Sequence, residues 1–138
     1  MSKKRNTEFL EAYVAFETVC SEKFGLRSGG ATEYINRLIK YTGAPERDSV
    51  LPKLVNYRNI RNRMAHENGA LAKINDIDSS DVRWLKKFAK KIVRKKDPIS
   101  LYERKGKNFK LRKFIGVLVT ILACIAATVV ALAIAGKI

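Results

Sequence analysis

Residues 57–66 of this 138-residue chain read YRNIRNRMAH and include its only histidine, His66. At roughly 100° per residue the segment predicts a helix, which begins upstream at a cap formed by Asp48 or Ser49. One side of the predicted helix is apolar, and Arg61 projects from the middle of that side, where an unpaired charge is costly. Such a conflict between local chemistry and packing is typical of functional sites.

The predicted helix has two unlike sides. The side expected to be buried carries Val50, Leu54, Tyr57, Met64 and Ala65, and the solvent side carries Lys53, Asn56, Arg63 and Glu67. Asn62 and His66 are four residues apart and therefore stack one turn above the other, with Asn59 a turn below. Pro52 falls in the expected first turn, where its missing N–H costs little. The sequence thus gathers arginine, asparagine and histidine toward the end of one helix.

The spacing Arg61-Asn62-x-x-x-His66 resembles the motif of the HEPN superfamily, small helical bundles that are often metal-independent ribonucleases. The motif of that family is an arginine, a polar residue that is often asparagine, and a histidine a few positions later on a late helix. The resemblance covers about residues 6–97 and does not extend to the C-terminal segment. In one branch of the family a tyrosine two positions after the histidine accepts a nucleotide, whereas Asn68 stands there in this chain.

The resemblance implies an endoribonuclease in which RNA is cleaved by its own 2′-hydroxyl, without a metal or another cofactor. His66 would move a proton, a role that suits imidazole because this group titrates near neutral pH. Arg61 would stabilise charge on the phosphate, and Asn62 would fix the imidazole tautomer or contact the substrate. Arg58 and Asn59 are the expected substrate-binding residues. Arg63 is either a further phosphate contact or, as the default, a solvated side chain. Family members commonly pair with two motifs facing one groove, which implies a homodimer, and they serve defence or toxin roles in bacteria and phages.

Other interpretations of the same residues stay open. A single histidine near a helix end is often structural, because it interacts with the C-terminal carbonyls, and an Arg-Asn pair can join helices by hydrogen bonds. The second function class is therefore a non-catalytic, tail-anchored binding or adaptor domain in which Arg61 and His66 are structural. A third is a small membrane-perturbing protein whose helical domain regulates its span.

The remainder of the first 97 residues also has helical periodicity. Four amphipathic segments with short links predict an all-α fold, an antiparallel bundle of four to five helices. The first segment ends at Gly25 and the last is broken by Pro98. The expected caps are Thr7, Thr32, and Ser79 or Ser80. The expected core side chains are Phe9, Leu10, Tyr13, Val14, Phe16, Cys20, Phe24, Ile35, Leu38, Ile39, Val82, Leu85, Phe88, Ala89, Ile92 and Val93.

Basic residues are concentrated in one late block. Lys+Arg 28 against Asp+Glu 13 gives a net charge of +15. Residues 1–82 hold 13 basic and 11 acidic side chains, whereas residues 83–113 hold 14 basic and 2 acidic ones. Such a block suggests RNA binding, because phosphate neutralisation drives non-specific affinity for RNA. For the lysines from 86 to 96 a solvated helix face is the default interpretation, and guidance of RNA is the alternative.

The two ends of the chain differ in their relation to membranes. The N-terminus lacks the apolar run of a secretory signal. Cys20 and Cys124 fall in different environments and predict no disulfide, and no Cys/His cluster predicts a metal site. Residues 114–136, by contrast, carry no charge, and as a helix they span roughly 35 Å, enough to cross a bilayer core of about 30 Å. A buried core helix is the alternative for this segment.

The basic flank gives an orientation to the predicted span. The positive-inside rule places residues 1–97, the bundle, in the cytoplasm and the tip at residues 137–138 across the membrane. Residues 98–113 are then a basic juxtamembrane linker and residues 114–136 the transmembrane helix of a single-pass, tail-anchored protein. Anionic lipid is the partner expected for the flank. Its basic side chains are Lys105, Lys107, Lys110, Arg112 and Lys113.

Overall fold

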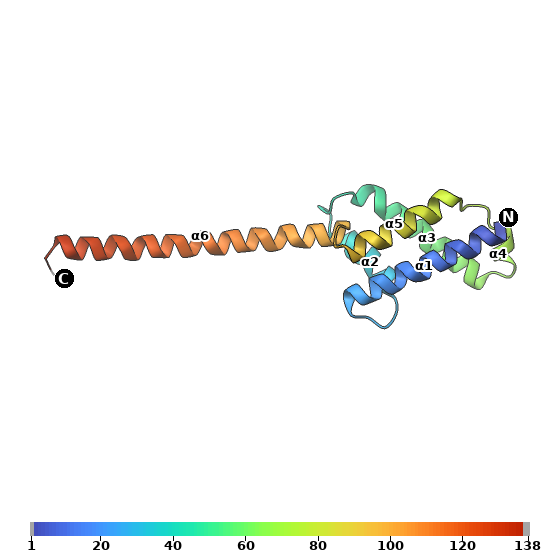
Figure 1. Ribbon diagram of the computed structural model, residues 1–138, viewed down its shortest axis with the longest axis horizontal. Coiled ribbons are helices and arrows are strands. Elements are labelled where there is room, and N and C mark those ends of the chain that lie inside the picture. The colour runs from blue at the N-terminus through green and yellow to red at the C-terminus, as the bar shows by residue number, and fades with distance from the viewer. Residues whose placement is uncertain (1, 137–138) are drawn as a thin grey trace. The chain divides into compact units, whose positions relative to one another are not determined.

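The structure of the chain is a computed structural model that describes residues 2–136. Every regular element in that range is an α-helix, as the sequence predicts (Figure 1). The helices are α1 (Ser2–Phe24), α2 (Gly30–Lys40), α3 (Arg47–His66), α4 (Ala70–Lys73), α5 (Ser79–Val93) and α6 (Pro98–Ile134). The chain divides into two units, one ending at Tyr102 and one starting at Glu103. The tip at residues 137–138 lies outside the described residues.

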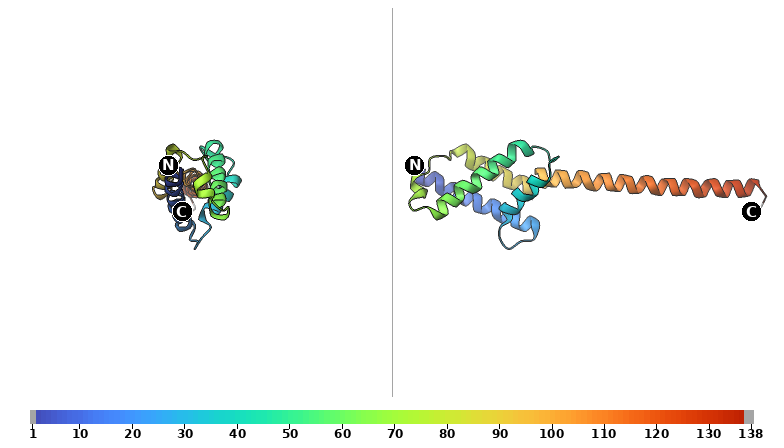
Figure 2. Two further views of the ribbon diagram at one scale, coloured as in Figure 1. Left: turned by 90° about the vertical axis from the view of Figure 1, so that its right-hand side faces the viewer. Right: turned by 180° about the vertical axis from the view of Figure 1, so that it is seen from behind.

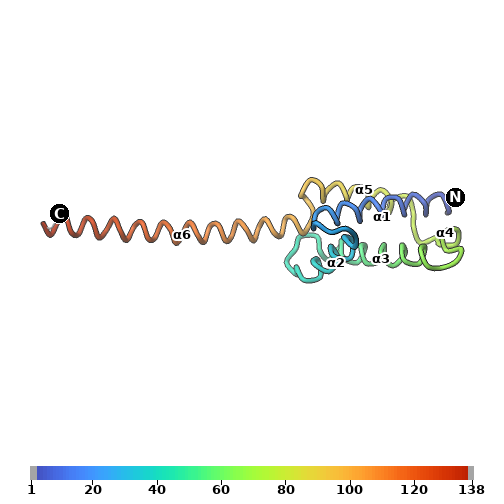
Figure 3. The backbone as a smooth tube through the Cα atoms, turned by 90° about the horizontal axis from the view of Figure 1, so that it is seen from below, coloured from blue at the N-terminus to red at the C-terminus, as the bar shows by residue number. Residues whose placement is uncertain are grey.

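Helix α1 is the centre of the first unit. It contacts each of α2, α3, α4 and α5, and it lies alongside α5 (Figure 3). Helix α3 packs against α2 and α4, and both α2 and α3 face the viewer when the unit is seen from behind (Figure 2). The motif helix is therefore supported by neighbouring helices along its length.

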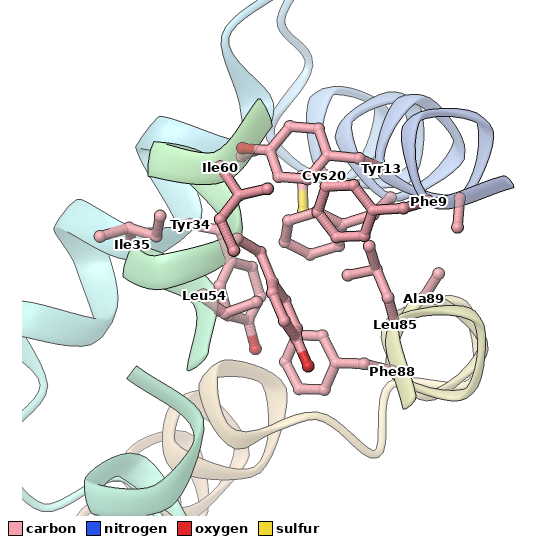
Figure 4. Packing of buried hydrophobic residues seen from close by; sticks show 14 of the residues in the cluster. Phe9, Tyr13, Cys20, Tyr34, Ile35, Leu54, Ile60, Leu85, Phe88 and Ala89 are labelled. Carbon is pink, nitrogen blue, oxygen red and sulfur yellow. The ribbon is translucent and has the colours of Figure 1, made fainter. Parts of the chain in front are cut away.

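The core of this unit is rich in aromatic rings. The ring of Phe16 lies 6.3 Å from that of Tyr34 and 5.9 Å from that of Phe88, and Tyr34 meets Phe88 edge to face at 5.6 Å. Figure 4 shows buried side chains of this core, among them Tyr34 and Phe88. Edge-to-face pairs add roughly 0.5–1.5 kcal/mol each beyond the area they bury.

Helix α1 begins earlier than the sequence predicts, so Thr7 is not its cap. The Thr7 hydroxyl instead donates to the backbone carbonyl of Lys3 at 2.8 Å, a local bond that hydroxyl side chains form inside helices. Asn6 is fully buried, and its amide donates to the carbonyl oxygens of Leu71 and Ile74 at 2.8 Å each. This contact with the end of α4 holds the first turns of α1 in helical form.

The link between α1 and α2 is tight. Helix α1 ends at Gly25 as predicted, with φ 65° and a 2.8 Å bond from the Leu26 N–H to the Ser21 carbonyl. Helix α2 starts at Gly30, so Thr32 is not its cap. The Gly30 N–H donates to Ser21 Oγ at 3.1 Å, and a Cβ on Gly30 would lie 2.1 Å from the Ser21 nitrogen. Only glycine allows the two helices to approach this closely.

Helix α3 also starts earlier than predicted. Its N-cap is Glu46, with φ 59°, and neither Asp48 nor Ser49 is the cap. Pro52 consequently lies inside the helix, beyond its first turn. The earlier start is tied to α2, because the Arg47 guanidinium donates to two carbonyl oxygens near the end of that helix, at 2.8 and 3.0 Å.

Helix α5 is capped by Asp78, not by Ser79 or Ser80. The Asp78 carboxylate accepts from the N–H groups of Ser80 and Asp81, and the Asp81 carboxylate accepts from the Asp78 N–H at 3.0 Å. The Ser80 hydroxyl, together with these amides, holds the pKa of Asp78 below its usual value. The Tyr57 hydroxyl donates to Asp81 at 2.7 Å, so this capping box is also joined to α3.

Helix α5 ends at Val93, before the predicted break at residues 97–98, and Pro98 instead begins α6, whose first turn belongs to the first unit. Asp97 is fully buried and accepts from the Tyr34 hydroxyl at 2.7 Å and from the Ser100 N–H at 3.3 Å. The Lys23 ammonium donates to Ser100 Oγ at 2.7 Å. Burial, with the Asp97 carboxylate next, raises the pKa of Tyr34, so its hydroxyl stays a donor. These contacts lie within the first unit, which extends to Tyr102.

Four side chains expected in the core are exposed instead. They are Val14, Ile39, Ala65 and Val93. Each lies at the margin of the apolar side of its helix, where no neighbouring helix covers it. Leu10 and Phe24 are partly buried, and the other predicted core residues are buried.

The second unit consists of the remainder of α6. The segment expected as a linker, residues 98–113, is helical and continuous with the apolar segment after it. All residues from Lys105 to Gly136 are exposed. By length and composition this is the one helix of the described range that could cross a membrane.

Candidate active site

The candidate site lies at the C-terminal end of α3. His66 is the last residue of the helix, because Glu67 adopts extended backbone and Gly69, with φ 73°, starts α4. The imidazole is exposed, and within residues 2–136 no hydrogen bond or ion pair holds it. His66 is therefore accessible to a ligand from solvent.

Arg61 is half-buried at the edge of the core, not in the middle of the buried side as the sequence suggested. Met64 and Ile60 occupy that side. The Arg61 guanidinium lies 6.0 Å from the centre of the Tyr13 ring and donates to the Asn62 side-chain oxygen at 3.2 Å. At this distance the ring contributes a weak cation–π contact, and most of the guanidinium donors are open to another acceptor.

A polar strip runs along one side of α3. Arg58, Asn62 and His66 follow at four-residue steps, so they lie roughly one above another, and Asn59 lies next to them. Arg58 is half-buried, whereas Asn59, Asn62 and His66 are exposed. The sequence-predicted site residues thus share one end of one helix.

The two residues expected to act on a phosphate do not converge within one copy of the chain. Arg61 and His66 are five residues apart, which separates them by roughly 140° around the helix and about 7.5 Å along it. Asn62 lies between them. In a single copy of α3 the side chains of His66 and Arg61 therefore point in different directions.

Tyr13 of α1 is a member of the site region that the sequence did not indicate. Its ring is buried beside Arg61. Burial, followed by the charge of Glu17, raises the pKa of Tyr13 to about 12, against the opposing effect of Arg61 and Arg58. Tyr13 is therefore a neutral phenol at physiological pH. It was assigned to the core from its spacing, and only the packing of α1 against α3 brings it to the arginines.

Arg63 lies beside the polar strip, four residues from Asn59 and three from His66, and ion pairs hold its side chain. Its guanidinium lies 3.6 Å from the Glu67 carboxylate and 3.2 Å from that of Asp76. These partly exposed ion pairs link the end of α3 to the segment before α5. Exposed pairs of this kind are worth little energy, roughly 0–1 kcal/mol.

The described residues contain no group of three His, Cys, Asp or Glu side chains close enough to hold a metal ion. The site therefore consists of one imidazole, two arginines, two amides and a neighbouring phenol. Such a set can bind a phosphodiester and move protons on it.

The fold and the site define an all-helical protein with one compact unit, an exposed polar strip on α3 and a long apolar helix. The chain belongs to DUF6548, a family of unknown function whose sequence profile matches residues 7–115. The match includes the whole candidate site and the basic part of α6. No curated protein and no solved structure matches the chain.

Proposed function

We propose that this chain is a membrane-anchored, metal-independent endoribonuclease of the HEPN type that works as a homodimer. The observation that carries the proposal is the open polar strip of α3, which ends in an exposed imidazole with no partner of its own among the described residues. Arg61 borders this strip with donors free for a phosphate. A role in bacterial or phage defence, as a toxin, follows from the HEPN resemblance.

The proposed reaction is attack by the 2′-oxygen of RNA on the adjacent phosphorus. The new bond joins the 2′-oxygen to phosphorus, and the bond from phosphorus to the 5′-oxygen breaks. His66 of one copy takes the proton of the 2′-hydroxyl, and His66 of the second copy donates a proton to the leaving 5′-oxygen. Arg61 stabilises the charge that grows on the phosphate oxygens, while Asn62 orients the imidazole. The products are a 2′,3′-cyclic phosphate and a 5′-hydroxyl.

Pairing of two copies would bring an Arg61 and a His66 to the same phosphate, although the two side chains point apart within one copy. Two α3 ends facing one groove would supply arginine and histidine from both sides of one phosphate. The apolar part of α6 is suited to the same arrangement, because small residues that recur every four positions let helices approach closely in lipid. Those residues are Ala123, Ala127, Ala131 and Ala135.

We also propose that α6 spans a membrane and that the first unit is cytoplasmic. The apolar side chains from Phe114 to Ile134 are exposed in the described structure, so a bilayer would provide the burial that the chain does not. The flanking basic side chains are exposed as well, and each contributes about 1 kcal/mol near anionic lipid. They are Lys105, Lys107, Lys110, Arg112 and Lys113.

A non-catalytic adaptor is the second candidate. The bond from Arg61 to Asn62 and the ring of Tyr13 beside the guanidinium support it, because both give the arginine a structural role. In that case the exposed polar strip would bind a partner protein.

The test is RNA cleavage by the full chain in nanodiscs of zwitterionic lipid. We expect His66→Ala to lower the rate by roughly 100-fold or more, and Arg61→Ala by a similar factor, because each removes transition-state stabilisation. Arg63→Ala is the matched control, since it removes an arginine that is held by ion pairs on the same helix, and we expect a change of about twofold or less.

The product ends add a second readout. A 2′,3′-cyclic phosphate supports attack by the RNA itself, whereas a 3′-hydroxyl would indicate attack by water at the other bond. Equal rates for the parent, His66→Ala and Arg61→Ala would exclude this site. Absence of cleavage by the parent on any RNA would favour the adaptor.

A further inference from the structure

A hollow of about 100 Å³ lies between the first turns of α3 and the middle of α5. Its wall includes the N-cap residue Glu46, Ser49 and Lys53 of α3, and Trp84, Phe88 and Lys91 of α5. The candidate active site is on the other flank of α3, where Arg61 meets Tyr13 of α1. The hollow is therefore a separate feature, and its volume corresponds to about three waters.

The ring of Trp84 forms one side of the hollow. It is the only tryptophan of the chain and is half-buried. It stacks on Phe88 with 5.0 Å between centres and 7° between planes, and it lies 5.8 Å from the Tyr57 ring. These neighbours fix the plane of the indole, which presents a rigid aromatic surface at the margin of the hollow.

Two lysines flank this ring. Lys53 Nζ lies 4.9 Å from the ring centre, and Lys91 Nζ lies 3.6 Å from the Glu46 carboxylate. Lys53 is exposed, and roughly half of the Lys91 side chain is exposed. Both contacts are solvent-accessible and involve long side chains, so either ammonium can turn to a phosphate at little cost.

The outer surface of α5 has one sign of charge. Between Val82 and Lys96 there is no acidic residue, and Trp84 interrupts a row of exposed cations. Those cations are Arg83, Lys86, Lys87, Lys90 and Lys91 of α5, and Arg94, Lys95 and Lys96 directly after its end. Rigid aromatic rings within a basic surface are the arrangement that single-stranded nucleic acids bind, because bases stack while phosphates pair with lysine.

We propose that this hollow is a binding site for single-stranded RNA, in which one base stacks on Trp84 while Lys53 and Lys91 bind the phosphates on either side. The hollow admits the edge of one ring and excludes a duplex. The proposal rests on RNA being the substrate of the candidate active site, but it uses different residues. Lys53 and His66 are about 20 Å apart along α3, so the site would hold the strand several nucleotides from the cleaved bond.

Trp84 provides a direct test, since the emission of the only tryptophan reports on this hollow alone. The full chain in zwitterionic nanodiscs is titrated with 2′-O-methyl octauridylate, which lacks the attacking hydroxyl and is not cleaved. We expect the oligomer to quench Trp84 by roughly half or more, because the base stacks on the indole. An abasic oligomer of the same length keeps the phosphates but has no base, and we expect it to leave the emission nearly unchanged.

Two double lysine substitutions distinguish a specific RNA-binding site at the hollow from non-specific electrostatic attraction of RNA to the basic surface. We expect Lys53→Gln with Lys91→Gln to lower affinity roughly tenfold and to reduce the slope of log K against log salt by about 1.4, the contribution of two phosphates. Lys86→Gln with Lys90→Gln removes the same charge from another part of α5, and we expect about a twofold loss at most. Equal losses for both pairs would overturn the proposal.

Two further measurements complete the test. Labelled-oligomer anisotropy should show a loss of roughly tenfold for Trp84→Leu in a variant that keeps its melting temperature, and the lysine pairs decide the matter if that variant unfolds. Anionic nanodiscs that change Trp84 emission as strongly as RNA does would assign the surface to lipid and overturn the RNA site. His66→Ala should bind normally, so a failed active site and a failed Trp84 site are distinguishable.

Discussion

In the first unit, apolar side chains such as Phe16, Tyr34 and Leu54 are buried against one another, whereas from Phe114 to Ile134 every side chain is exposed. Both regions are helical and both are rich in apolar residues. The difference lies in periodicity: α1, α3 and α5 each have an apolar side and a polar side, while the second half of α6 is apolar all round. A helix with one apolar side can bury that side against other helices. A helix that is apolar all round, like the second half of α6, needs a surrounding apolar medium such as a lipid bilayer.

The largest effect is expected from a cavity in the first unit. Leu54 is 1% exposed, and Leu54→Ala should lower the free energy of unfolding by about 2–5 kcal/mol, because the lost contacts are not recovered. Denaturant unfolding followed by Trp84 emission measures this change. Leu132→Ala in α6 is the matched control and should leave that transition where it is. A shift of equal size in both variants would mean that the two regions share a core.

The reverse contrast is expected for a charge in the apolar segment. Leu122 lies near the middle of residues 114–136, and Leu122→Arg should disfavour membrane insertion by about 3–4 kcal/mol, because it adds the cost of arginine and removes the favourable contribution of leucine. Resistance to alkaline extraction from membranes measures insertion. Leu111→Arg, placed in the basic part of α6, should remain in the membrane fraction. Neither variant should change the unfolding of the first unit, and insertion of Leu122→Arg at the parental level would argue against a span.

The smallest effect concerns the capping box of α5. The pKa of Asp78 is lowered by the Ser80 hydroxyl and by backbone amides, so folding favours the charged carboxylate. Its stabilising contribution is complete above the unfolded pKa of about 4, and it is lost as the pH falls toward the lower folded value. The melting temperature of the parent should therefore fall more steeply than that of Asp78→Asn between about pH 5 and pH 2. Asp48→Asn, at a fully exposed side chain, is the control. Parallel curves for the parent and Asp78→Asn would remove Asp78 as a source of acid sensitivity.

Residue periodicity predicts the features of the fold that depend on local sequence. The helical class, the end of α1 at Gly25 and most of the buried side chains follow from residue spacing, because each depends on a local pattern. The helix starts do not follow. Asn6 extends α1 by bonding to the end of α4, and Arg47 starts α3 by bonding to α2. These partners are far away in sequence, so the local cap signals at Thr7 and Asp48 were misleading.

In the candidate site, too, features that depend on contacts between distant parts of the sequence could not be predicted. The motif fixed the position of Asn62 and His66 on one side of a helix, and the structure places both at its exposed end. It did not indicate that Arg61 would reach the helix edge or that Tyr13 would lie beside it, because both depend on how α1 crosses α3. The hollow beside Trp84 could likewise not be predicted, because α3 and α5 enclose it together.

The burial of Cys20 makes the chain a convenient object for chemical labelling. Its sulfur is fully enclosed by the aromatic core, and burial raises the pKa of the thiol, so the reactive thiolate is scarce at neutral pH. The second free cysteine, Cys124, lies in the apolar stretch of α6. A water-soluble maleimide added to the unaltered protein therefore reacts with Cys124 alone. The extent of labelling of Cys124 distinguishes an α6 that is shielded by acyl chains from one that is exposed to water.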